Sequence, residues 1–188
     1  MNLFKAISTV GAYTLLSRVF GFIRDILIAN FLGASSVADA FFVAFRFPNL
    51  FRRLFAEGAF AAAFVPIFTA SLEKDGRNGA LEFANQAFTI LAIFLFLFVA
   101  FMEATMPWAM VVLAPGFGGI EGKIEMATDF SRIAFPYLFF ISLVSLQSGV
   151  LNSIHRFGAA AAAPVLLNLT FISAMLVFPG DSAHTGLV

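Results

Sequence analysis

Charged side chains interrupt the first two apolar stretches of this sequence. Those in the first stretch are Arg18, Arg24 and Asp25, and those in the second are Asp39, Arg46, Arg52, Arg53 and Glu57. A charge at the centre of a lipid bilayer costs about 2.5–3.5 kcal/mol on insertion scales, so such residues normally face a wet cavity or a partner rather than lipid. The pattern therefore predicts a polar binding surface within a membrane protein, and ion recognition rather than covalent chemistry.

Helical spacing indicates which of these charges lack a partner. Ser17 and Arg24 lie on one stripe of a helix over the first stretch. Asp25 adjoins Arg24 but points about 100° away, so local spacing leaves Arg24 unpaired. The same holds for Arg18 and Arg52. Guanidinium groups bind phosphate oxygens through two parallel hydrogen bonds, so unpaired arginines predict a phosphate-bearing substrate.

Other charges favour a structural role. Asn49, Arg53 and Glu57 follow one another at intervals of four residues, about one helical turn each. Arg53 and Glu57 are therefore predicted to pair along the helix. Arginines also snorkel to the membrane interface, and they lock helices together where a carboxylate is within reach. A purely structural role therefore stays open for Arg18, Arg24 and Arg52. Asp25 and Asp39 are the carboxylates with which they could lock helices together.

Composition excludes several classes of protein. Hydrophobic residues make up 61% of the chain and charged residues 12%, against about 45–50% and 25% in soluble domains. The chain has no cysteine and only two separate histidines, so no thiolate chemistry or metal-ligand spacing is present in the sequence. It contains no phosphate-binding P-loop motif, and its net charge of zero argues against nucleic-acid binding.

Five apolar segments are long enough to cross a membrane as helices, for which about 20 residues are needed. They cover roughly residues 7–32, 38–70, 83–113, 132–152 and 158–178, and none shows the period of two that barrel strands require. The second is too long for one straight crossing. Pro48 and the cluster around Arg52 and Gly58 predict that it is bent or broken. We expect a loose loop over 115–131, and a hydrogen bond between helices from Asn168.

Basic residues in the loops predict the orientation, because Lys and Arg accumulate on the cytoplasmic side. With the N-terminus inside, the cytoplasmic side holds Lys5, Lys74, Arg77 and Arg156, and the outer side holds Lys123, with Arg132 at a boundary. We therefore expect a cytoplasmic N-terminus. No closing element follows the fifth segment, so the chain is expected to be the N-terminal part of a longer protein.

One long block of the sequence matches a known family pattern. It comprises residues 21–25 (GFIRD), Gly33-Ala34, 38–46 (ADAFFVAFR), 48–60 (PNLFRRLFAEGAF) and 64–66 (FVP). In this block the chain resembles the MurJ (MviN) family of lipid II flippases. Residues 151–153 (LNS), Arg156-Phe157 and Ala163-Pro164 fit the same family, so the resemblance covers nearly the whole chain.

The resemblance implies an all-α integral membrane fold. About five transmembrane helices here would form most of the N-terminal lobe of a two-lobed, fourteen-helix transporter. That transporter belongs to the multidrug/oligosaccharidyl-lipid/polysaccharide exporter superfamily. The implied function is movement of lipid II, an undecaprenyl-pyrophosphate-linked peptidoglycan precursor, from the inner to the outer leaflet of the bacterial cytoplasmic membrane by alternating access.

The resemblance also implies site residues and partners. Arg18, Arg24 and Arg52 match the family's cavity arginines, which hold the pyrophosphate and head group. Asp25 and Asp39 are expected to pair with these arginines. The full set of expected supporting residues is Ser17, Asp25, Asp39, Asn49, Arg53 and Glu57. Expected partners are lipid II, membrane lipids and cell-wall synthesis proteins, with no nucleic acid, no cofactor in this part of the protein and no enzymatic activity.

Three alternatives remain at this point. Another exporter of the superfamily would move drugs or a different polyprenyl-linked sugar, although a cationic-drug exporter should show unpaired carboxylates. A membrane scaffold for cell-wall enzymes should tolerate substitution of Arg24 or Arg52. An integral membrane enzyme acting on polyprenyl phosphates would need clustered carboxylates, whereas the acidic residues here are scattered.

Overall fold

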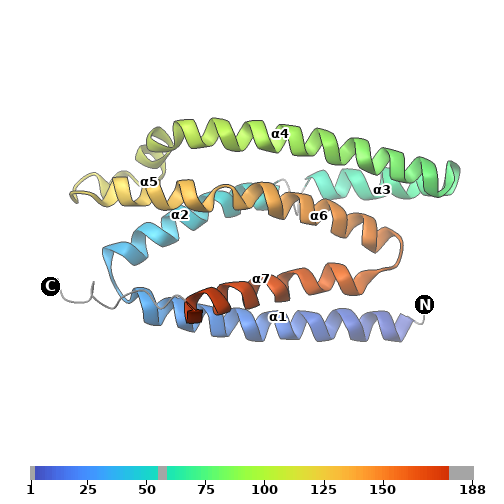
Figure 1. The fold of residues 1–188 in the computed structure, drawn as a ribbon, viewed down its shortest axis with the longest axis horizontal. Coiled ribbons are helices and arrows are strands. Elements are labelled where there is room, and N and C mark those ends of the chain that lie inside the picture. The colour runs from blue at the N-terminus through green and yellow to red at the C-terminus, as the bar shows by residue number, and fades with distance from the viewer. Residues whose placement is uncertain (1–2, 55–58, 178–188) are drawn as a thin grey trace. The chain divides into compact units, whose positions relative to one another are not determined.

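The computed structural model describes residues 3–54 and 59–177. Over these residues the chain is helical, without a strand, so the predicted all-α class is confirmed (Figure 1). The helices in chain order are α1 (Leu3–Leu32), α2 (Ser36–Arg52), α3 (Ala59–Lys74), α4 (Gly76–Leu113), the 3-10 turn η2 (Pro115–Phe117), α5 (Lys123–Ala134), α6 (Tyr137–Ser153) and α7 (Phe157–Val177).

Three segments of the described chain are long and apolar enough to cross a membrane: Gly76–Leu113, Lys123–Ser153 and Phe157–Val177. They correspond to the third, fourth and fifth predicted spans. Helix α4, with 38 residues, is about 57 Å long at 1.5 Å per residue. That length exceeds the hydrocarbon core of about 30 Å, so part of α4 extends beyond it. The first two predicted spans are not among these three segments and stay predictions.

The second predicted span contains two helices, α2 and α3. Helix α2 continues through Pro48, which is almost fully buried, and ends at Arg52. Arg53 and Leu54 lie in a wider, π-type turn, a local departure from α geometry that recurs at functional sites. The regular helix therefore ends beside the arginine pair rather than at the proline. Gly58, also expected to interrupt this span, lies outside the described residues.

The loop predicted over 115–131 is shorter than expected. Helix α5 begins at Lys123, so the second half of that region is helical. Its buried residues Lys123, Ala127 and Ser131 recur every four positions, which is the spacing of a helix with one face in a core. The buried face could not be recognised from the sequence, because Lys123 and Ser131 on it are polar. Phe135 and Pro136 then separate α5 from α6.

The chain forms two compact units, which are described separately. In the first, made of residues 1–34 and 155–188, α1 and α7 lie side by side and run in the same direction (Figure 1). Gly158 brings the helices close, because a Cβ there would lie 3.6 Å from Cγ2 of Thr9. Small residues at such positions allow close packing of membrane helices.

The second unit, residues 35–154, contains α2 to α6. One hydrophobic cluster joins α2, α4, α5 and α6 around Phe47, Met106 and Phe135. Its ring contacts include Phe47 with Phe135, whose centroids are 5.4 Å apart. A second cluster packs α3 and α4 against α6, with Leu95 fully buried. The first cluster fixes the direction of α2, which carries the second group of predicted site residues.

Candidate functional site

A polar cluster lies between α1 and α7 in the first unit. Nη1 of Arg24 donates a hydrogen bond to Oδ1 of Asn168, at 2.8 Å. Nδ2 of Asn168 in turn donates to the backbone carbonyl of Ser17, at 3.0 Å, and lies 3.4 Å from the Ser17 hydroxyl. Asn168 is 6% exposed, so its amide is satisfied by α1 rather than by solvent. The predicted hydrogen bond between helices from Asn168 is confirmed.

Arg24 is paired, and the prediction that it lacks a partner is wrong. Its Nε and Nη2 donate to Oδ1 of Asp25 at 3.0 and 2.8 Å. The flexible arginine side chain bends back toward its neighbour, so the 100° between the two Cβ directions does not separate the charged groups. The expected pairing of Asp25 with an arginine is thereby observed.

The guanidinium of Arg24 keeps capacity to bind an anion. It carries five N–H groups, and the contacts with Asp25 and Asn168 use one on each nitrogen. One N–H on Nη1 and one on Nη2 therefore remain for a ligand. The side chain of Arg24 is 29% exposed. Guanidinium N–H groups are donors that phosphate oxygens accept.

Arg18 lies one and a half turns before Arg24 on α1 and is exposed. Among the residues that the structure describes, it has no hydrogen-bond or ion-pair partner. Its assignment as a substrate ligand stays a prediction.

On α2, Arg52 has a neutral partner on its own helix face. Its Nε donates to Oδ1 of Asn49, three residues earlier, at 3.2 Å. The expectation of an unpaired Arg52 is therefore wrong. Arg53 is exposed, and its predicted partner Glu57 lies outside the described residues.

Asp39 pairs with a lysine rather than with a predicted cavity arginine. Its Oδ2 accepts a bond from Nζ of Lys123 at 2.8 Å, which joins the first turn of α2 to the first residue of α5. The sequence interpretation placed Lys123 in an outer loop and missed this contact. Helical spacing gave no signal for it, because the two residues are 84 positions apart.

The predicted site residues are divided between the two units. Ser17, Arg18, Arg24 and Asp25 belong to the first, whereas Asp39, Asn49, Arg52 and Arg53 belong to the second. Each unit contains one arginine that is hydrogen-bonded to an asparagine side chain: Arg24 to Asn168 in the first unit and Arg52 to Asn49 in the second. A single site that combines both groups remains a prediction.

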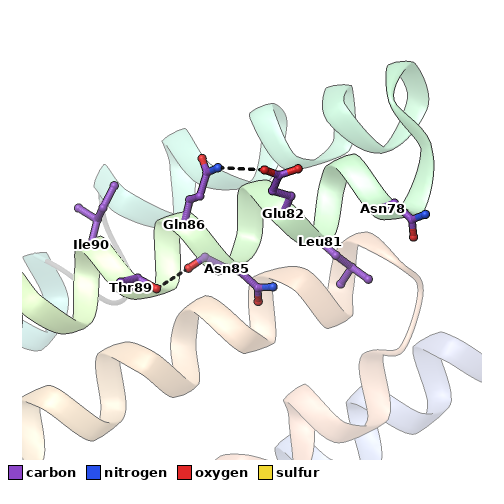
Figure 2. A pocket seen from close by; sticks show the side chains of 7 residues that line it. All are labelled: Asn78, Leu81, Glu82, Asn85, Gln86, Thr89 and Ile90. Atoms are coloured by element: carbon purple, nitrogen blue, oxygen red, sulfur yellow. Dashed lines mark hydrogen bonds between the residues drawn. The ribbon is translucent and has the colours of Figure 1, made fainter.

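A shallow groove of about 710 Å³ lies elsewhere, along the N-terminal half of α4. Figure 2 shows its lining, which comes entirely from this helix: Asn78, Leu81, Glu82, Asn85, Gln86, Thr89 and Ile90. Two of its contacts stay within the helix, from Gln86 Nε2 to Glu82 and from Thr89 Oγ1 to the Asn85 carbonyl. None of the predicted site residues lines it. We interpret the groove as a polar helix surface.

The described residues contain no group of three His, Cys, Asp or Glu side chains that could hold a metal ion. Separately, the polar groups on α1 and α2 present guanidinium N–H donors of Arg24 and Arg52. Recognition of a phosphate-bearing ligand is the chemistry that this arrangement supports.

Comparisons with known proteins agree with the resemblance. The family model described as "Lipid II flippase MurJ" matches residues 28–188. The chain is 49% identical over 176 residues to the probable lipid II flippase MurJ of Rhizobium tropici, covering 93% of this chain and 33% of that protein. It is 46% identical over 174 residues to the lipid II flippase MurJ of Burkholderia cenocepacia, covering 93% and 34%. The chain therefore spans about a third of the length of the curated relatives it matches.

Proposed function

Because this chain belongs to the lipid II flippase MurJ family, we propose that it forms part of a flippase for lipid II. The flippase moves this lipid from the inner to the outer leaflet of the bacterial cytoplasmic membrane by alternating access. The N-terminus lies in the cytoplasm. No covalent step is involved, so the protein acts as a transporter and not as an enzyme.

The observation that carries this proposal is the set of hydrogen bonds made by the Arg24 guanidinium. Asp25 and Asn168 orient its guanidinium while two N–H groups remain for a ligand. A pyrophosphate group carries several acceptor oxygens and negative charge, and an oriented arginine binds such a group through two hydrogen bonds. Orientation in advance lowers the cost of ordering a flexible side chain on binding.

We infer that Arg18 and Arg52 contribute further contacts to the same head group. Arg18 is exposed without a partner among the described residues, and we infer that it binds the same anionic head group. We infer a third contact from Arg52, whose Nε is held by Asn49. The supporting residues are Ser17, Asp25, Asp39, Asn49, Arg53 and Glu57.

The names of the matched relatives favour lipid II over the alternatives. Another exporter of the superfamily, a scaffold and a polyprenyl-phosphate enzyme would each need an observation that supports them.

The test is lipid II exposure on the outer leaflet of cells that depend on a full-length protein with Arg24→Ala. We expect exposure to fall at least tenfold at an unchanged protein level. The matched control is Arg77→Ala, because Arg77 is an exposed arginine at the start of α4. If Arg24→Ala leaves exposure and growth unchanged, Arg24 is no substrate ligand and the scaffold interpretation gains ground.

A further inference from the structure

Lys123 is a buried cation outside the predicted anion site. It is the first residue of α5, and its side chain is 8% exposed. Lysine is almost never buried to this extent unless it is paired. The position is also electrostatically unfavourable, because the N-terminus of a helix repels positive charge. The surroundings of Lys123 must therefore compensate for both effects.

Two groups provide this compensation. Nζ of Lys123 lies 2.8 Å from Oδ2 of Asp39 and 4.4 Å from the centre of the Phe117 ring. Asp39 occupies the first turn of α2, where the helix dipole favours a negative charge. An aromatic face adds attraction for an ammonium group. The contacts join the start of α2, the turn η2 and the start of α5.

The ion pair is asymmetric in its exposure. The side chain of Asp39 is 63% exposed, whereas that of Lys123 is 8% exposed. Oδ1 of Asp39 makes no hydrogen bond to the residues that the structure describes. Lys123 therefore holds the carboxylate from its buried side and leaves its other oxygen accessible.

Helix α2 is held by this ion pair at its first turn and by the hydrophobic cluster along its length, which includes Ala40, Phe47 and Phe51. Asn49 and Arg52 follow Phe47 within the next turn and a half of the same helix. A shift at the first turn would change the direction of the segment that carries them, because a helix transmits such a shift as a rigid body.

We propose that Lys123 is a positioning residue for transport: it fixes the start of α2 on α5 and thereby sets where Asp39 and the arginines of α2 lie. This inference rests on the proposed function for its effect on lipid II. Its effect on α2 is independent of the substrate.

The first experiment follows α2 directly in the full-length protein, with any other cysteines replaced. A thiol introduced by Arg46→Cys, at an exposed position of α2, is labelled with a water-soluble maleimide. We expect Lys123→Met to change the labelling rate at least threefold, and Lys123→Arg to keep it near the original value. Labelling at Arg77→Cys on α4 should stay unchanged as the control. Equal rates at the α2 position with and without Lys123→Met would overturn the proposal.

The second experiment measures lipid II transport per protein molecule in proteoliposomes. We expect Lys123→Met to lower the rate at least fivefold and Lys123→Arg to keep at least half of it. A pair that only stabilises the fold would lower the melting temperature and the yield but leave the rate per molecule unchanged, and this result would refute the inference. If Lys123→Met does not fold, Asp39→Asn removes the same ion pair from its exposed side and is expected to change the labelling rate of the Arg46→Cys thiol at least threefold; an unchanged rate would overturn the proposal.

The two experiments separate the two proposals. If the unmodified protein moves no lipid II but Lys123→Met changes labelling, the proposed function fails while the role of Lys123 in positioning α2 holds. If the unmodified protein transports and Lys123→Met transports equally well per molecule, the role of Lys123 in transport fails while the proposed function holds.

Discussion

The carboxamide of Asn168 on α7 joins Arg24 and Ser17 of α1, which lie seven residues apart on one face of that helix. Its oxygen accepts from the guanidinium at 2.8 Å, and its nitrogen donates to the Ser17 carbonyl at 3.0 Å. One buried amide therefore connects the two helices and orients the arginine. Gly21 lies beside this amide, at a position where a Cβ would make an ordinary contact of 3.5 Å with Nδ2 of Asn168.

Substitution of this amide should weaken the contact between α1 and α7. Asn168→Leu keeps a similar volume but removes both hydrogen-bonding atoms, so we expect a loss of about 1 kcal/mol in stability. Transport should fall as well, because Arg24 loses an orienting partner. Thermal unfolding of the detergent-solubilised full-length protein checks the first effect. The control is Thr170→Val, since the exposed Thr170 hydroxyl donates only to the Leu166 carbonyl of its own helix; an equal loss in both variants would contradict the prediction.

Asp25→Asn should affect binding more than stability. The ion pair with Arg24 is partly exposed, with side-chain exposures of 29% and 65%, and such pairs contribute about 0–1 kcal/mol. Loss of the negative charge leaves Arg24 more attractive to an anion. We expect binding of a pyrophosphate lipid to tighten about threefold, the equivalent of about 0.7 kcal/mol, and release to slow. Binding and transport measured in the same proteoliposomes check this, and weaker binding would show that the orienting effect of Asp25 on Arg24 outweighs the competition of its carboxylate with the ligand.

Arg52→Lys should not preserve function, although it preserves charge. Lysine lacks the planar fork that binds a phosphate through two hydrogen bonds, and it cannot reproduce the Nε contact with Asn49. We expect transport to fall about tenfold, which corresponds to about 1.4 kcal/mol. The same exchange at Arg77, exposed at the start of α4, is the control. Full activity of Arg52→Lys would show that only charge matters at this position.

Ser142→Ala should stabilise the second unit. The Oγ of Ser142 is buried without a hydrogen-bond partner among the described residues, and such an unsatisfied group costs about 1–3 kcal/mol. We therefore expect a higher melting temperature. Ser131→Ala is the comparison, because Ser131 is equally buried but its hydroxyl contacts Sδ of Met110 at 3.4 Å. A lower melting temperature for Ser142→Ala would show that the hydroxyl has a partner in the membrane-embedded protein.

The class of protein was predictable from the sequence alone. Hydropathy is a sum over neighbouring residues, so the long apolar segments that contain α4, α6 and α7 could be recognised without a fold. The family could also be recognised, because the block from Gly21 to Pro66 is a local pattern of residues. Asn168 was identified correctly as well, since an amide within an apolar helix requires a partner.

The pairing of charges was decided only by the tertiary structure. Asn168 is 144 residues from Arg24, and Lys123 is 84 residues from Asp39, so helical spacing cannot reveal either contact. Even the local pairs of Arg24 with Asp25 and of Arg52 with Asn49 differed from expectation. The long side chain of Arg24 rotates around several bonds and reaches a carboxylate that its Cβ direction does not indicate, whereas Asn49 lies on the same helix face as Arg52 and is a neutral partner. The sequence by itself determined which charges lie within the apolar segments, whereas the packing of α7 on α1 and of α5 on α2 decided which groups neutralise them.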